Sequence, residues 1–211
     1  MEGVAVVLLN LPELIAKYQL RITGVVHCGA RLGEEAGEYA ACGISNVWWI
    51  EANPEVLPQL RARVEPMGHK VIQALLYDQD HQWVPFHVTN FEGISSSILE
   101  FGTHPSFSPD VEFVTEHTLL SATLDTLVAE NGIAGCNFLS MDLQGAELYC
   151  LRGATKLLPS IDYVMSEVNT AEVYKGCAHI EELDAFLEGF QRVETFMMGD
   201  QCWGDALWCR R

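Results

Sequence analysis

A short run of small and acidic residues, VVHCGARLGEE at residues 25–35, is the first place where this chain could hold a ligand. The pattern predicts a buried strand, a turn that contains Gly29 and Gly33, and the acidic start of a helix. Glycine lets a backbone approach a ligand closely. In open α/β sheets, ligands bind beyond the carboxyl ends of the strands. The sequence therefore predicts a cofactor turn here.

A second acid, Glu51, stands at the end of the next predicted strand, VWWIE. An acid at this place can accept hydrogen bonds from a ribose, which NAD and S-adenosylmethionine both contain. The pyrophosphate of a dinucleotide needs the amides and the dipole of a helix N-terminus. Glu34 and Glu35 hold that position and would repel it. The residues favour S-adenosylmethionine, which carries a sulfonium and an ammonium, over a nicotinamide cofactor.

Two further acids lie at the ends of later predicted strands. Asp142 ends the strand NFLSMD, and Glu167 lies in the strand DYVMSEV. Methyl transfer depends on alignment of the reacting atoms, and an acid of raised pKa can take the proton of the acceptor. Asp142 could hold the cofactor's ammonium or act as that base, whereas Glu167 is either catalytic or paired with the turn above it. The candidate catalytic residues are Asp142, Glu167 and His104.

A long segment rich in Gly, Ser and Pro, residues 90–110, interrupts the regular pattern. Loops of this length inside a compact domain are often functional, so we predict a substrate loop. Serines of a flexible surface loop are the alternative. The residues predicted to line the acceptor site are Ser95, Ser96, Ser97 and Asn169.

The elements that position these residues alternate between strand-like and helix-like segments. Strands are predicted at residues 24–28, 46–51, 70–77, 137–142, 162–168, 190–198 and 205–211, with a short edge strand at 83–88. Helices are predicted within 1–20 and at 33–42, 54–64, 123–130, 146–158 and 180–187. The alternation implies a mostly parallel sheet that is covered on both faces. The last two strands lie too close for a crossover helix and should pair antiparallel.

Composition argues against several classes of protein. Twelve Lys and Arg residues against 29 Asp and Glu residues give a net charge of −17, so a phosphate-neutralising surface for nucleic acid is not expected. The N-terminal residues lack a basic leader and a long apolar run, so no membrane association is expected. The seven cysteines include no Cys-x-x-Cys pair, which predicts free thiols and a cytoplasmic location. The histidines near residue 80 match no metal-ligand spacing, and no metal site is predicted.

The motifs also occur in a characteristic order. VVHCGARLGEE is followed by VWWIEANPE, LDTLV, FLSMDLQGAELYCLRGA, SEVNTAEVYKG and WGDALW. The block D-x-Q-G-x-E-x-x-x-L-x-G-A runs from Asp142 to Ala154. In these motifs the chain resembles FkbM-type methyltransferases over roughly residues 20–211.

The resemblance implies an α/β, Rossmann-like class I methyltransferase fold in one domain, residues 1–211. Its seven-stranded mixed sheet would have helices on both faces and an antiparallel last strand. The resemblance also implies S-adenosylmethionine-dependent O-methylation of a sugar or of another small-molecule hydroxyl. A nicotinamide oxidoreductase and an inactive S-adenosylmethionine-binding module remain the alternatives.

The family pattern, together with the strand ends, also suggests where the cofactor lies. His27 stands where many members carry Asp, so the contact at this position is left open. Asp78 follows the third strand and could accept from the adenine amino group or simply stabilise a turn. Glu147 could cap its helix or serve the site. The candidate cofactor-binding residues are His27, Gly29, Ala30, Gly33, Glu51, Ala52, Asn53, Asp78 and Asp142.

Overall fold

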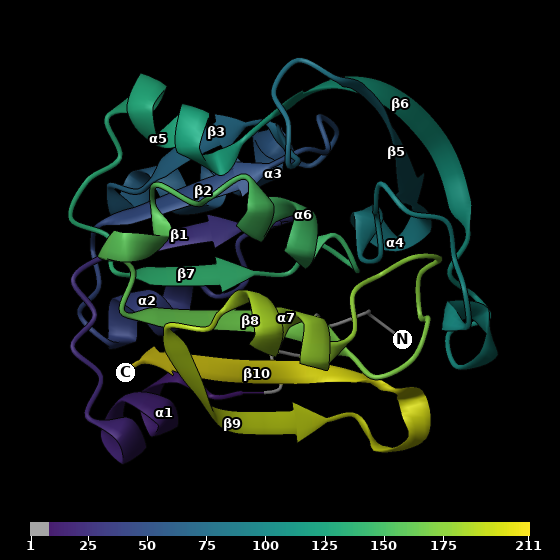
Figure 1. Ribbon diagram of the computed structural model, residues 1–211. Helices are drawn as coiled ribbons and strands as arrows, with labels where there is room; N and C mark the ends of the chain where they lie inside the picture. Colours follow the sequence, from purple (N-terminus) through teal and green to yellow (C-terminus); the bar gives the residue numbers. More distant parts are fainter. Residues whose placement is uncertain (1–8) are drawn as a thin grey trace.

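A seven-stranded sheet forms the centre of the computed structural model, which describes residues 9–211. Its strands are β1 (Val25–Cys28), β2 (Val47–Glu51), β3 (Lys70–Gln73), β7 (Phe138–Met141), β8 (Tyr163–Asn169), β9 (Phe190–Met197) and β10 (Trp203–Arg210). They lie in the order β3-β2-β1-β7-β8-β10-β9 (Figure 1). The first five are parallel, whereas β10 runs antiparallel to β8 and to β9. The predicted antiparallel pairing of the last two strands is confirmed.

Helices cover both faces of this sheet, as predicted. One face carries α1 (Leu11–Tyr18), α2 (Ala36–Ala41) and α3 (Leu57–Val64), and the other carries α5 (Leu124–Asn131), α6 (Glu147–Arg152) and α7 (Ile180–Phe186). An apolar core lies on each face of the sheet. Successive side chains of β1 point into these two cores alternately, because neighbouring residues of a strand point to opposite faces. Val25 packs with the first group of helices and Val26 with the second. The strands are therefore apolar without alternation.

A second, smaller sheet was not predicted. It contains β4 (Leu75–Leu76), β6 (Phe113–Ala122) and β5 (Trp83–Thr89), in that order. The predicted strand 70–77 is wrong as one unit, because the chain leaves the main sheet at Ala74 and continues as β4. The predicted edge strand 83–88 is β5, at the edge of this second sheet, where Pro85 needs no N–H for a ladder. Figure 1 shows β5 and β6 as a long curved ribbon that reaches beyond the main sheet.

Several predicted boundaries also shift. The helix predicted at 33–42 starts only at Ala36, and the helix predicted at 146–158 ends at Arg152. The segment 90–110 is not a plain loop, since it contains a left-handed turn, labelled α4 (Asn90–Gly93), and the 3₁₀ turn η2 (His104–Ser106). Asn10 caps α1 by accepting a hydrogen bond from the amide of Glu13 at 3.0 Å. Residues 1–8 of the predicted N-terminal helix lie outside the described residues.

Candidate active site

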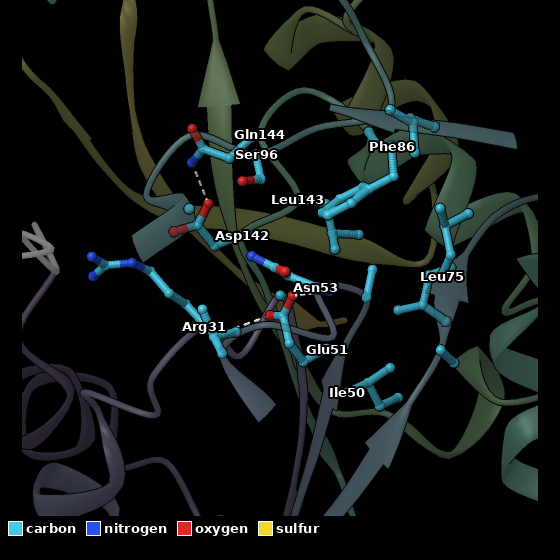
Figure 2. Close-up of a pocket in the computed structure, with 18 of the residues that line it drawn as sticks. Arg31, Ile50, Glu51, Asn53, Leu75, Phe86, Ser96, Asp142, Leu143 and Gln144 are labelled. Atoms are coloured by element: carbon cyan, nitrogen blue, oxygen red, sulfur yellow. Dashed lines mark hydrogen bonds between the residues drawn. The ribbon is translucent and has the colours of Figure 1, made fainter. Parts of the chain in front are cut away.

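Two adjoining cavities open at the carboxyl ends of β1, β2, β7 and β8. The first cavity, of about 70 Å³, lies between the end of β2, β4 and the segment after β5 (Figure 2). The second cavity, of about 240 Å³, lies between β1, β7, β8 and the segment 94–111. The residues that line both cavities are Gly29, Arg31, Ile94, Asp142 and Gln144.

The turn after β1 brings backbone to the junction of the cavities. Gly29 has a φ of +85°. A Cβ atom at this position would lie 1.8 Å from the carbonyl oxygen of Asp142. No residue with a side chain fits there, so glycine is required for this close approach of β1 to β7. Gly33 lines neither cavity, because it packs against Leu60 and Val64 of α3.

Glu51 ends β2 with its carboxylate in the first cavity. Its two oxygens accept hydrogen bonds from the amides of Arg31 and Asn53, each at 2.6 Å (Figure 2). Burial raises the pKa of this carboxyl, and the bonds from the two amides oppose that shift. Each carboxylate oxygen has a second lone pair, so the group can still accept bonds from a ligand. The predicted residues Ala52 and Asn53 also line this cavity, and Ala30 lines the second.

Asp142 and Glu167 are brought together above the ends of β7 and β8. The side-chain amide of Gln144 donates to Asp142 Oδ1 at 2.5 Å and to Glu167 Oε2 at 2.6 Å. The hydroxyl of Tyr174 in turn donates to Gln144 Oε1 at 2.5 Å. Gln144 is held in a left-handed conformation, with a φ of +53°. Sequence reasoning did not place Gln144 or Tyr174 in the site.

The environment raises the pKa of Glu167 more than that of Asp142. Burial raises the pKa of Glu167 well above its ordinary value, and the neighbouring charges of Asp142 and Glu147 raise it further. Burial also raises the pKa of Asp142, but the hydrogen bond from Gln144 opposes this shift. Glu167 therefore holds a proton more tightly than Asp142 does, and Asp142 is the acid of the pair that ionises first.

Glu147 serves the turn that follows Asp142. Its Oε1 accepts hydrogen bonds from the amides of Leu143 at 2.8 Å and Gly145 at 3.2 Å. It lines neither cavity. Of the two roles considered for Glu147, its contacts favour the structural one.

His27 and Glu35 line the second cavity as uncharged groups. Burial lowers the pKa of His27 to about 3, and its Nδ1 lies 2.8 Å from the hydroxyl of Tyr39. Burial raises the pKa of Glu35 to about 8. The 3.9 Å approach of His27 to Glu35 is therefore not an ion pair at neutral pH. The repulsion expected against a pyrophosphate rests on Glu34 alone, and Glu34 is paired with Arg31.

His104 joins the second cavity from the segment 94–111. Its Nε2 lies 3.1 Å from the hydroxyl of Ser95, and its Nδ1 is buried without a partner. The ring stacks on Phe101, with 4.4 Å between centroids. Burial lowers the pKa of His104 to about 4, so the ring is neutral near pH 7.

The predicted serines separate. Ser95 lines the second cavity and Ser96 lines the first. Ser97 lines neither, because its hydroxyl donates to the backbone carbonyl of Gln144 at 2.8 Å. Ser95 and Ser97 are buried, so the alternative of serines in a flexible surface loop does not describe them.

Asp78 and Asn169 line neither cavity. Asp78 follows β4, whose residues Leu75 and Leu76 line the first cavity, and its Oδ1 is buried without a hydrogen-bond partner. The cofactor contact expected of Asp78 stays a prediction. Asn169 is fully buried at the end of β8, where its backbone lies opposite Trp203 of β10, and neither Oδ1 nor Nδ2 of its side chain has a hydrogen-bond partner. Its role in the acceptor site stays a prediction.

Within residues 9–211, no group of three or more His, Cys, Asp and Glu side chains is arranged to hold a metal ion. Over the same residues, no helix is both long and apolar enough to cross a bilayer.

Solved structures with a similar fold bind related cofactors. Magnesium protoporphyrin IX methyltransferase (ChlM) of Synechocystis PCC 6803, solved with bound S-adenosylmethionine, is 9% identical with a TM-score of 0.53. The similarity covers 95% of this chain and 76% of that one. TrmK of M. capricolum, in complex with S-adenosylhomocysteine, is 10% identical with a TM-score of 0.54, over 98% of this chain and 70% of that one. The predicted class I methyltransferase fold is confirmed.

Sequence comparison identifies the family. The 2-O-methyltransferase NoeI of Sinorhizobium fredii (strain NBRC 101917 / NGR234) is 24% identical over 170 residues, which cover 77% of this chain and 69% of NoeI. The family profile described as "Methyltransferase FkbM domain" matches residues 27–194. With this match over most of its length, the chain belongs to the FkbM methyltransferase family.

Proposed function

We propose that this protein transfers a methyl group from S-adenosylmethionine to a hydroxyl of a sugar or of another small, uncharged molecule. The observation that carries the proposal is the pair formed by Asp142, which is exposed and lines both cavities, and Glu167, which is buried and lines the second. An acid that faces two adjoining cavities suits removal of a proton from one ligand while it faces the other.

The first cavity fits the adenosine part of the cofactor. Apolar side chains, including Leu75, Phe86 and Leu143, form its walls, and the Glu51 carboxylate lies at one end. This combination suits an apolar base and the diol of a ribose. The missing Cβ of Gly29 leaves the backbone open to close approach. S-adenosylmethionine, when bound, supplies a methyl group activated by its sulfonium.

The residues of the second cavity would handle the acceptor. Asp142 takes the proton of the acceptor hydroxyl as the oxygen–methyl bond forms and the sulfur–methyl bond breaks. Gln144 holds Asp142 in place, and Glu167, which holds a proton more tightly, leaves the negative charge on Asp142. The neutral His104, with its unpartnered Nδ1, is a second polar contact for the acceptor.

The acceptor is expected to be uncharged. The aromatic residues Phe107 and Trp203 in the second cavity could pack against a sugar ring. Among the described residues, Arg31 is the single Lys or Arg of its lining, and it is paired with Glu34. Glu35 is uncharged at neutral pH, so an anionic acceptor would be disfavoured mainly by the charge of Asp142.

Methyl transfer to matched acceptors tests this function. Labelled methyl from S-adenosylmethionine should pass to neutral glycosides in a single turnover, whereas the corresponding uronates, which carry a carboxylate, should react at least about tenfold more slowly. The label should be recovered as a methyl ether. Preferential methylation of the uronates contradicts the acceptor assignment. Cofactor binding without transfer to any member of the panel favours an inactive binding module.

Three further proposals concern the whole protein. The seven free cysteines support a reducing, cytoplasmic setting. The net charge of −17 argues against a nucleic-acid partner. The continuous main sheet supports one methyltransferase domain, with the segment 90–110 as its substrate loop.

A further inference from the structure

Among residues 9–211, Arg31 is the single lysine or arginine that lines the two cavities, and it lines both of them. Its backbone amide binds Glu51 in the first cavity. Figure 2 shows the guanidinium directed away from Glu51, on the same side of the turn as Asp142. Arg31 thus connects the expected ribose end of the site to the cavity that holds the acids.

The guanidinium is mostly buried, and it is held by one carboxylate and by two backbone carbonyls. Its Nη1 donates to Glu34 Oε1 at 2.5 Å, which forms an ion pair. Its Nη2 and Nε donate to the carbonyls of Phe91 at 2.8 Å and Glu92 at 3.2 Å. The Arg31 side chain is 15% exposed. These contacts place a permanent positive charge at the junction of the cavities.

The charges of the proposed cofactor are matched by this arrangement. Its sulfonium and ammonium are cations, and the acids around the second cavity suit both. Its amino-acid part also carries one carboxylate, which needs a cation or several amides. A guanidinium binds a carboxylate with two parallel hydrogen bonds. Of the described residues in the cavity lining, Arg31 is the one permanent cation that can do so.

We propose that Arg31 binds the carboxylate of the cofactor's amino-acid part, and that its exchange of partners from Glu34 to this carboxylate accompanies cofactor binding. This inference rests on the proposed function, since it assumes S-adenosylmethionine as the cofactor. The competing role is structural. Phe91, Glu92 and Gly93 have left-handed backbones, with φ of 51°, 59° and 75°, and Arg31 holds the first two by their carbonyls.

Two ligands separate these roles. S-adenosylhomocysteine and 5′-methylthioadenosine share the adenosine and the thioether, but the second lacks the amino-acid part. The Arg31→Gln variant should bind S-adenosylhomocysteine about ten- to a hundredfold more weakly, because charge-assisted bonds to the carboxylate are lost. Its affinity for 5′-methylthioadenosine should stay within about threefold of the wild type. Calorimetric titration measures both values, and retained binding of 5′-methylthioadenosine also shows that the variant is folded.

Matched variants sharpen the test. Arg31→Lys keeps the charge but loses the paired donors, so its loss should be intermediate. Arg61→Gln removes a positive charge from α3, where Arg61 forms an exposed ion pair with Glu65. This variant should leave the affinities for both ligands unchanged. An equal loss for both ligands in Arg31→Gln assigns the residue to holding residues 91–93 and overturns the proposal, as does no loss for either. If the wild type binds neither ligand, the proposed function fails, and the Arg31 assignment falls with it.

Discussion

The Asp142→Asn variant is expected to transfer methyl groups about 10²- to 10⁴-fold more slowly than the wild type at saturating S-adenosylmethionine. The substitution keeps the shape of the side chain but removes the group that accepts the acceptor's proton. The affinity for S-adenosylhomocysteine should change little. Single-turnover rates and calorimetric affinities measured on the same preparation separate the two effects.

Glu167→Gln provides the matched comparison. Because Glu167 holds its proton more tightly than Asp142 does, a neutral amide of the same size should cost less than about tenfold in rate. In the wild type, the rate should rise with pH through the pKa of Asp142, which burial raises above 3.8, because the ionised form is the active one. A weakened affinity with a normal rate in Asp142→Asn would instead assign Asp142 to the cofactor's ammonium. A collapse of the rate in Glu167→Gln alone would exchange the two roles.

The Gly29→Ala variant is expected to lose cofactor binding and most of its stability. Its Cβ would lie 1.8 Å from the carbonyl oxygen of Asp142, so β1 and β7 would have to separate. Gly68 is the matched control, because its φ of +83° is nearly the same and no heavy atom lies within 4 Å of its Cβ position. Gly68→Ala should cost about 1–2 kcal/mol for the left-handed backbone alone.

Urea denaturation measures both costs as free energies of unfolding. Gly29→Ala should lose several kcal/mol more than Gly68→Ala, or should fail to accumulate as folded protein. Titration with S-adenosylhomocysteine shows whether any folded fraction of the variant still binds this ligand. Equal costs for the two variants would show that the approach of Gly29 to Asp142 is not essential.

The parts of the site that lie on parallel strands could be predicted from the sequence. Gly29, Glu51 and Asp142 each follow a short apolar run, and the carboxyl ends of parallel strands meet at one edge of a sheet. Their proximity therefore follows from the order of the strands alone. The structure places all three around the first cavity.

The parts that depend on the second sheet could not be predicted in the same way. β6 is largely exposed and lacks the apolar run of a central strand, so its sequence resembles a loop. The break at Ala74 is set by pairing of β4 with the distant β6, and it brings Leu75 and Leu76 to the first cavity. Local patterns carry no information about such long-range pairing.

Two other features of the site depend on tertiary structure. Gln144 contacts both acids from the turn that follows Asp142, and Tyr174, 30 residues further along the chain, contacts Gln144. Glu35 is acidic in the sequence but uncharged at neutral pH, because burial raises its pKa to about 8. The repulsion of a pyrophosphate that the sequence predicts from Glu34 and Glu35 is therefore weaker than expected, because Glu35 carries no charge.

Calorimetric titration with S-adenosylhomocysteine and with NADH distinguishes the proposed methyl donor from a nicotinamide cofactor. We expect one-to-one binding of S-adenosylhomocysteine and no binding of NADH. We also expect the affinity for S-adenosylhomocysteine to fall about tenfold or more in the Glu51→Ala variant, because one or two bonds to the ribose, each worth about 1.5–3 kcal/mol, disappear. Binding of NADH in place of S-adenosylhomocysteine, or an unchanged affinity in a folded Glu51→Ala variant, would contradict the proposed cofactor site.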